Sequence, residues 1–341
     1  MPRHPRSLKI LNWNASSVIS KKAEFQHLLH RLSIDIACVS ETFLKPHISF
    51  NIPHYSIYRT DRVTHGGGTA ILIKSTIPHA HTPLTNLTNI ETTTIALYLG
   101  KDKILLSACY KPPNKILFPS DLDAILPRAT TAVAIGDFNA KNTVYHCNST
   151  NSAGVTLLNY ANLKPDIQLH IPSEPTRSPL TYQNPDILDI AISINWKYPT
   201  TSTVLNELSS DHLPVVITVD SLPQFLCPFP NKPNYDWTIY RDKLTILTTT
   251  PTLASPNDVD NATLTLQNNI MTALKASEKK KSYVPQYYRL PPEITELMTR
   301  RNKIRRDYQT YRLPHIKTEY KDSIRGYKNL FWLTDPNPGT T

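Results

Sequence analysis

Short apolar runs separated by turn residues fill the chain from residue 8 to residue 219, and this pattern constrains the fold more than any other feature. Apolar runs of about five to seven residues bounded by Gly, Pro, Asn and Asp are typical of strands. Three helix-like stretches lie between them, at 22–32, 121–128 and 153–161. Many strands with few helices predict an α/β fold in which two packed sheets are flanked by helices. The predicted strands are 8–13, 36–40, 69–73, 94–99, 104–110, 132–136, 188–193 and 215–219.

The pattern changes at residue 221. Residues 222–233 contain four prolines and predict an extended linker, and short helices are expected at 235–247 and 263–277. Within 291–332 an apolar stripe at helical spacing, broken at Pro314, predicts two amphipathic helices. We therefore expect a first domain at 1–220, a Pro-rich linker with short helices at 221–290, and a basic helical hairpin and tail at 291–341. The hairpin is expected to pack loosely on the first domain or not at all.

Positive charge is concentrated near the C-terminus. The chain has 37 Lys/Arg and 27 Asp/Glu, a net charge of +10, and residues 279–328 alone hold 14 and 5. This excess favours a polyanionic partner: DNA, and RNA as a second candidate that the basic helices would bind. The alternative is that these charges form a solvated helix surface. The runs 279–281 and 300–306 are also compatible with nuclear import, although such runs are common.

Several function classes are excluded by composition. With eight glycines and neither GxGxxG nor GxxxxGK[ST], the chain lacks the usual nucleotide-binding loops. No apolar stretch is long enough to span a membrane, and the first residues lack the apolar core of a secretory signal, so we expect an intracellular protein. Cys38, Cys109, Cys147 and Cys227 match no zinc or redox pattern. Cys38 and Cys109 fall in apolar runs and are expected in the core.

The strongest local motif is Gly136-Asp137-Phe138-Asn139 at the end of an apolar run. Because side chains two residues apart on a strand project to the same side, Asp137 and Asn139 could together hold and polarise a water. The alternative is an Asx turn that merely ends the strand. A second motif is Asp211-His212, which precedes an apolar strand and offers a group that titrates near neutral pH. Its alternative is a surface loop.

Other polar side chains at strand ends are weaker signals. Glu41 follows an apolar strand and is a natural oxygen ligand for a hard divalent cation. Asn14 ends the first strand, Tyr110 ends another, and Asp189 interrupts an apolar run where it needs a partner or a cleft. Each of these alone could be an ordinary strand-end residue.

Together and in this order, the six motifs resemble the endonuclease/exonuclease/phosphatase superfamily, whose members include deoxyribonuclease I and the apurinic endonucleases. Further segments are similar to the endonuclease domain of jockey-type non-LTR retrotransposons. These are YRTDR at 58–62 before the triple glycine, GDFNAKN at 136–142, EPT at 174–176 and PDILD at 185–189. Residues 141–146 depart from that pattern, since the family usually has a histidine beside the lysine and a tryptophan soon after.

The tail resembles the segment that joins this endonuclease to a reverse transcriptase. No Tyr/Phe-x-Asp-Asp polymerase motif is present, so we expect a truncated reading frame, a fragment or a domesticated remnant.

The resemblance implies a four-layer α/β sandwich like that of deoxyribonuclease I. It also implies a hydrolase that nicks DNA using Mg²⁺ or Mn²⁺ and leaves a 3′-hydroxyl. Glu41 would be the principal metal ligand, helped by Asn14 and Asp211. Asp137 would orient or deprotonate the attacking water, with Asn139 beside it. Tyr110 and His212 would donate hydrogen bonds to the phosphate. Asp189 would fix the tautomer of His212.

Residues outside the centre are also assigned to DNA contact, and those on the basic helices are assigned from their positive charge. For Arg59 and Arg62 the alternative is an ion pair with Asp61 or a neighbour. The set is Arg59, Arg62, Lys141, Thr176, Arg300, Arg301, Arg305 and Arg306. Two other functions stay open: a catalytically decayed nucleic-acid-binding remnant, and a phosphodiesterase acting on RNA or another phosphate ester.

Overall fold

The computed structural model describes residues 6–99, 101–180, 184–222, 234–279 and 290–334. The chain divides into two compact units, Met1–Cys227 together with Tyr288–Thr341, and Pro228–Tyr287. The predicted linker at 223–233, Cys227, and the basic residues Lys280 and Lys281 lie outside the described residues.

The first unit contains two six-stranded sheets. One has the order β11-β12-β1-β2-β4-β3, in which β1 and β2 are parallel and the other neighbours antiparallel. Its strands are β1 (Arg6–Asn14), β2 (Ile36–Ser40), β3 (Tyr55–Thr60), β4 (Thr69–Lys74), β11 (Thr200–Val204) and β12 (Val215–Leu222).

The other sheet has the order β5-β6-β7-β8-β10-β9, with β7 parallel to β8. Its strands are β5 (His79–His81), β6 (Glu91–Leu99), β7 (Asp102–Tyr110), β8 (Thr131–Asp137), β9 (Ile167–His170) and β10 (Asp189–Ile194).

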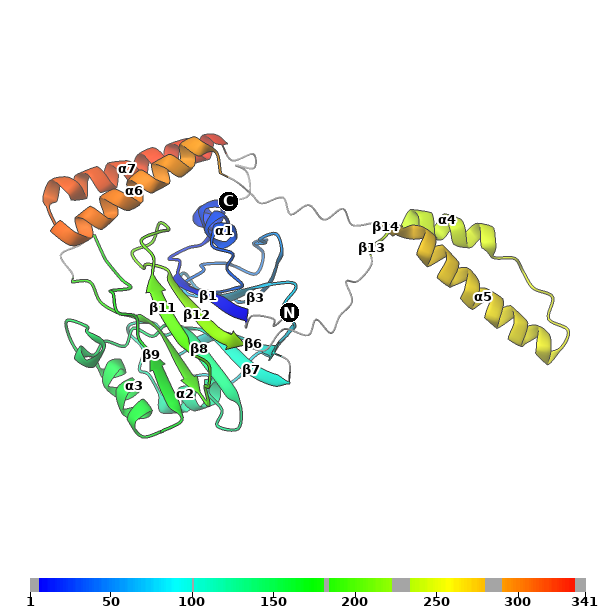
Figure 1. Cartoon of the computed structure of the whole chain (residues 1–341), viewed down its shortest axis with the longest axis horizontal. Coiled ribbons are helices and arrows are strands. Elements are labelled where there is room, and N and C mark those ends of the chain that lie inside the picture. Colours follow the sequence, from blue (N-terminus) through cyan, green and yellow to red (C-terminus); the bar gives the residue numbers. More distant parts are fainter. Residues whose placement is uncertain (1–5, 100, 181–183, 223–233, 280–289, 335–341) are drawn as a thin grey trace. The chain divides into compact units, whose positions relative to one another are not determined.

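The sheets pack face to face, and each is covered on its outer side (Figure 1). Both faces of a strand are covered because its side chains alternate between them. On β2, Ile36 and Cys38 enter the core between the sheets, whereas Ala37 and Val39 join the outer cluster with Leu28. Helix α1 (Lys22–Arg31) supplies that outer cluster, and α2 (Pro119–Ile125) and α3 (Ser152–Asn162) cover the second sheet. The predicted four-layer α/β sandwich is observed.

The eight predicted strands and three predicted helices of this region are all present. Strands β3, β5, β9 and β11 are not among the predicted strands because they are short or carry polar residues, such as the Thr200–Val204 sequence TTSTV. Residues 61–68, which include the triple glycine, join β3 to β4 as a loop. Gly67 and Gly68 have φ of +66° and +85°, and a Cβ on Gly68 would meet Thr42 Oγ1 at 2.7 Å.

The second unit is a helical hairpin of α4 (Trp237–Leu247) and α5 (Pro256–Ser277). Short strands β13 (Asn234–Tyr235) and β14 (Glu278–Lys279) pair antiparallel at its base. Helix α5 begins with a capping box in which Ser255 and Asp258 bond each other's backbone amides.

The C-terminal hairpin consists of α6 (Pro292–Tyr311) and α7 (Pro314–Thr334), which lie side by side (Figure 1). The break at Pro314 is as predicted, but the loose packing is wrong. Ile294 and Met298 of α6 are buried, and the side chains of Arg301 and Arg305 are buried against the first domain. In the described residues no helix is long and apolar enough to cross a membrane.

Candidate active site

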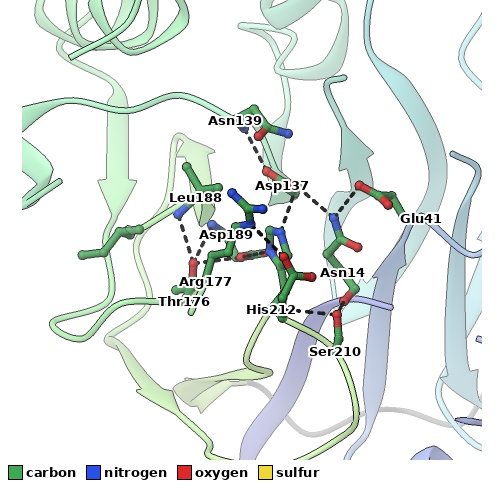
Figure 2. Close-up of polar contacts among 12 residues, drawn as sticks. Asn14, Glu41, Asp137, Asn139, Thr176, Arg177, Leu188, Asp189, Ser210 and His212 are labelled. Atoms are coloured by element: carbon green, nitrogen blue, oxygen red, sulfur yellow. Dashed lines mark hydrogen bonds and ion pairs between the residues drawn. The ribbon is translucent and has the colours of Figure 1, made fainter. Parts of the chain in front are cut away.

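Six strands bring their polar ends to one edge of the sandwich. Parallel β1 and β2 end together, where Asn14 pairs with Ser40, and Glu41 follows. In the other sheet Asp137 of β8 lies opposite both Tyr110, which ends β7, and Asp189, which begins β10. The loop before β12 carries His212, which directly follows Asp211 in the chain, to the same edge (Figure 2). These polar strand ends therefore converge at one edge of the sandwich.

Asn14 connects the two sheets at this edge. Its side-chain Nδ2 donates 2.9 Å hydrogen bonds to Glu41 Oε1 and to Asp137 Oδ2 (Figure 2). Because one amide nitrogen contacts both carboxylates, Asn14 in this arrangement acts as a donor, and its oxygen accepts from the backbone amide of Ser16. Two acidic groups from different sheets are thereby held side by side.

Glu41 has an unusual backbone conformation. Its φ is +48°, in the left-handed region that non-glycine residues rarely adopt. Such a conformation costs about 1–3 kcal/mol and persists where the surroundings enforce it. Here the Glu41 carbonyl accepts from Ser17 N at 2.9 Å, and Thr42 N donates to Gly68 O at 3.2 Å. The strain turns the carboxylate, which is partly exposed, toward Asn14.

His212 is fixed by a buried carboxylate. Its Nδ1 donates to Asp189 Oδ2 at 2.7 Å, and its Nε2 lies 3.8 Å from Asp137 Oδ2. Asp189 is fully buried and also accepts from the Thr176 hydroxyl at 2.8 Å. The same hydroxyl accepts from the amides of Leu188 and Asp189, both at 3.0 Å. Thr176 was assigned to DNA contact, which is wrong because its side chain is buried and orients Asp189 instead.

The buried charges shift one another's protonation. Burial raises the pKa of Asp137, and the Asp189 charge adds to this, although His212 opposes it. Burial lowers the pKa of His212, but the charges of Asp189 and Asp137 outweigh it and the net shift is upward. The edge therefore combines a carboxylate of increased basicity with an imidazole that favours its protonated form.

Asn139 and Tyr110 complete the centre. The Asn139 amide donates to Asp137 Oδ1 at 2.9 Å, and its side chain donates to Lys111 O at 3.0 Å. Its φ of +46° places it in the left-handed region that Asn tolerates. Burial and the Glu41 carboxylate raise the pKa of the Tyr110 phenol, so it remains a donor.

Asp211 is paired with Arg177. Its Oδ2 accepts from Arg177 Nε at 2.9 Å, and this partner and the His212 charge oppose burial to lower the Asp211 pKa. Arg177 was not predicted as a site residue, although it follows EPT directly in the sequence. The interpretation of Asp211 as a metal ligand has no support in this geometry.

Three residues assigned to DNA contact bond to the protein itself. Arg59 donates to the carbonyls of Ile48 and Lys45 and pairs with Asp61. Arg62 pairs with Glu91, and Lys141 pairs with Asp186 at 2.6 Å. For Arg59 the alternative ion pair is the one observed.

The four α6 arginines split into two classes. Arg300 and Arg306 are exposed, whereas Arg301 and Arg305 are 1% and 2% exposed and point into the first domain. Their assignment to DNA contact is therefore wrong for Arg301 and Arg305. The sequence held a signal that was overlooked: residues 294, 298, 301, 305 and 308 follow the four–three spacing of one helix face.

The donor set at the edge suits a hard divalent cation. Glu41 offers a partly exposed carboxylate, and Asp137 and Asn139 lie nearby. Within the described residues no cluster of three or more His, Cys, Asp or Glu has metal-binding geometry. A sparse carboxylate set is compatible with Mg²⁺, which keeps several waters and binds through one or two carboxylates plus substrate phosphate.

Known proteins resemble this chain in both sequence and fold. Residues 104–216 match the family model described as Endonuclease-reverse transcriptase. The probable RNA-directed DNA polymerase from transposon X-element of Drosophila melanogaster is 29% identical over 333 residues, which is 93% of this chain and 36% of the relative. The RNA-directed DNA polymerase from mobile element jockey of the same species is 24% identical over 323 residues, 89% of this chain and 34% of the relative. The chain thus spans about a third of the length of these relatives.

Among solved structures, the endonuclease domain of TRAS1, a telomere-specific non-LTR retrotransposon, aligns with a TM-score of 0.52 at 16% identity. The alignment covers 63% of this chain and 99% of that domain, so the described sandwich matches a whole endonuclease fold. The resemblance seen in the sequence is therefore confirmed: residues 104–216 match the endonuclease–reverse transcriptase family model, most of the chain is similar to the jockey and X-element retrotransposon proteins, and the sandwich has the fold of the TRAS1 endonuclease domain.

Proposed function

We propose that this chain hydrolyses phosphodiester bonds in DNA, making a nick that leaves a 3′-hydroxyl, as target-primed retrotransposition requires. One observation carries the proposal: a single edge joins Glu41 and Asp137 through Asn14 and holds His212 on Asp189. Acid, base and cation ligand are then within reach of one phosphate.

Asp137 is the proposed base. Its Oδ1 and Oδ2 accept from the Asn139 amide and from Asn14, which fixes the orientation of the carboxylate. Because burial raises its pKa, the carboxylate accepts a proton more readily than an exposed aspartate. It would orient the attacking water and take its proton, while Asn139 holds that water or a phosphate oxygen.

His212 is the proposed donor to the phosphate. With Nδ1 committed to Asp189, the other ring nitrogen Nε2 faces the Asp137 side of the edge. The raised pKa keeps a proton on Nε2, so it can donate to the oxygens that gain charge as the bond breaks. Tyr110 adds a second donor from its phenol.

Mg²⁺, or Mn²⁺, would bind at Glu41 and supply Lewis-acid stabilisation of charge on the phosphate. The residues of this chain that would hold it are Glu41 as ligand and Asn14, which sets the orientation of that carboxylate.

DNA is the proposed substrate because the chain has a net charge of +10 and exposed arginines on α6, Arg300 and Arg306. Arg177, beside Asp211 at the same edge, is about 30% exposed and is a candidate for a phosphate flanking the cleaved bond.

The direct test is nicking of supercoiled plasmid by the full chain, with Mg²⁺, with Mn²⁺ and with a chelator. We expect metal-dependent conversion to the open circular form, and extension of the nick by a DNA polymerase without prior phosphatase treatment, which requires a 3′-hydroxyl.

Glu41→Gln is the matched control, since it removes one charge and keeps the shape of the side chain. If the parent chain binds DNA but does not nick it in the presence of metal, the proposal is overturned in favour of a decayed binding remnant. Faster cleavage of RNA or of a small phosphate ester than of DNA would overturn the choice of substrate.

A further inference from the structure

Helix α6, which follows the second unit in the chain, inserts two arginines beneath the loop that carries His212. Arg301 and Arg305 lie one helical turn apart and are both almost fully buried. Arginine is rarely buried unless its donors are matched, so the partners of these two side chains show what the helix holds.

Arg305 donates hydrogen bonds to three backbone carbonyls of the loop before Asp211. Its guanidinium donates to Leu208 O at 2.7 Å, to Ser210 O at 2.5 Å and to Glu207 O at 3.3 Å. The planar fork of donors therefore spans three of the four residues before Asp211. Leu208 has φ of +59°, a conformation that a leucine adopts only when its surroundings enforce it.

Ser210 connects the loop held by Arg305 to the active-site residues Asn14 and His212. Its hydroxyl donates to Asn14 O at 2.9 Å and accepts from the His212 backbone amide at 3.2 Å (Figure 2). The residue whose carbonyl Arg305 holds is thus bonded to the residue that links the two carboxylates and to the residue that would donate to the phosphate.

Arg301 anchors the helix beside this loop. It forms a buried ion pair with Glu24 of α1 and donates to the Ser209 hydroxyl at 2.7 Å. Ser209 in turn donates to Glu24 Oε2 at 2.6 Å. Docking of α6 and the shape of the loop are therefore parts of one bonded network.

We propose that Arg305 is a positioning residue of the active site: by holding the carbonyls of residues 207–210 it places the His212 ring for turnover. This inference rests on the proposed function. It makes a helix beyond the first domain necessary for full nuclease turnover.

The test compares the full chain with Arg305→Gln in steady-state nicking. Because small misplacements of a reacting group are costly, we expect kcat to fall by about 10- to 100-fold while KM changes less than about threefold. Arg305→Lys keeps the charge but not the planar fork, and we expect an intermediate kcat. If Arg305→Gln does not fold, Arg305→Lys carries the test.

Two controls separate positioning from stability and from charge. Ile104→Val removes one methylene from the core at the end of β7 far from Tyr110, and Lys303→Gln removes a positive charge from the exposed face of α6. Both should keep the parental kcat. A parental kcat in Arg305→Gln, or an equal loss in Ile104→Val at the same stability, would overturn the proposal.

A readout without catalysis distinguishes failure of this inference from failure of the proposed function. In metal-free NMR spectra we expect the His212 ring resonances to move in Arg305→Gln and its backbone amide to exchange faster, but neither in Lys303→Gln. If the parent does not nick, the proposed function fails while the spectra still decide on the positioning. Unchanged His212 signals in Arg305→Gln would refute it.

Discussion

The hydroxyl of Thr176 donates a hydrogen bond of 2.8 Å to Oδ2 of Asp189, the oxygen that also accepts a hydrogen bond from Nδ1 of His212. The same hydroxyl caps two buried amides. Thr176 therefore links the backbone at the start of β10 to the orientation of the Asp189 carboxylate.

Thr176→Val tests that link. Valine has the same shape but no hydroxyl, so the buried amides of Leu188 and Asp189 lose their acceptor. An unsatisfied buried donor costs about 1–3 kcal/mol, and we expect the free energy of unfolding in urea to fall by at least that much. Thr176→Ser, which keeps the hydroxyl, should lose less than half as much. Equal losses in the two variants would show that the methyl group matters rather than the hydrogen bonds.

The His212–Asp189 pair should act as a unit in turnover. Removal of a preorganised donor typically costs about 100- to 1,000-fold in kcat, so we expect that range for His212→Ala and nearly as much for Asp189→Asn. The double variant should be little slower than either single variant. Nicking kinetics of the three variants provide the measurement, with the exposed Asp166→Asn as control. Parental activity in His212→Ala would remove His212 from the mechanism.

Glu41→Gln should change the metal requirement. Replacing the carboxylate by an amide weakens binding of a hard cation but leaves the hydrogen-bond partners of Asn14 in place. We expect nicking that is slow at low Mg²⁺ and partly recovers as Mg²⁺ or Mn²⁺ is raised. A metal titration of parent and variant measures this. Identical half-saturating concentrations would place the cation elsewhere.

The Arg301–Glu24 pair should be costly to break from one side. Both side chains are about 1% exposed, so Arg301→Met leaves a buried carboxylate without its partner. Breaking such a pair costs about 3–5 kcal/mol, whereas replacing both members by apolar residues is often neutral. We expect Arg301→Met to lose stability in that range and Glu24→Leu/Arg301→Met to recover most of it. Arg300→Met, at an exposed position, serves as the control.

Much of the sandwich could be predicted from the sequence because buried strands leave apolar runs. The ends of those runs located Asn14 and Asp137 correctly, since polar residues at the ends of neighbouring buried strands lie together at one end of the sheet, and Asp189 stood out as the polar residue that interrupts an apolar run. The edge strand β11 could not be predicted, because a polar strand with one open side leaves no apolar signature.

The sequence was less informative about which polar and charged side chains point into the protein. Thr176 and Arg305 look like surface residues by composition, and their real partners, Asp189 and the carbonyl of Ser210, are fixed only by tertiary structure. The matching acid for Arg301 is Glu24, which the sequence places 277 residues away.

The contacts of Arg305 also determine when, during translation, the loop before His212 can be completed. They join residues separated by 97 and 95 positions, so the loop before His212 is complete only after α6 has left the ribosome. At about 5–20 residues per second, that delay is roughly 5–20 s after the last strand of the sandwich has been made. The nascent sandwich can therefore fold before α6 restrains this loop, and if the proposed function holds, the growing chain would nick DNA more slowly during that interval. Nicking activity should therefore be lower in ribosome-bound chains stalled before α6 has emerged than in chains from which α6 has emerged.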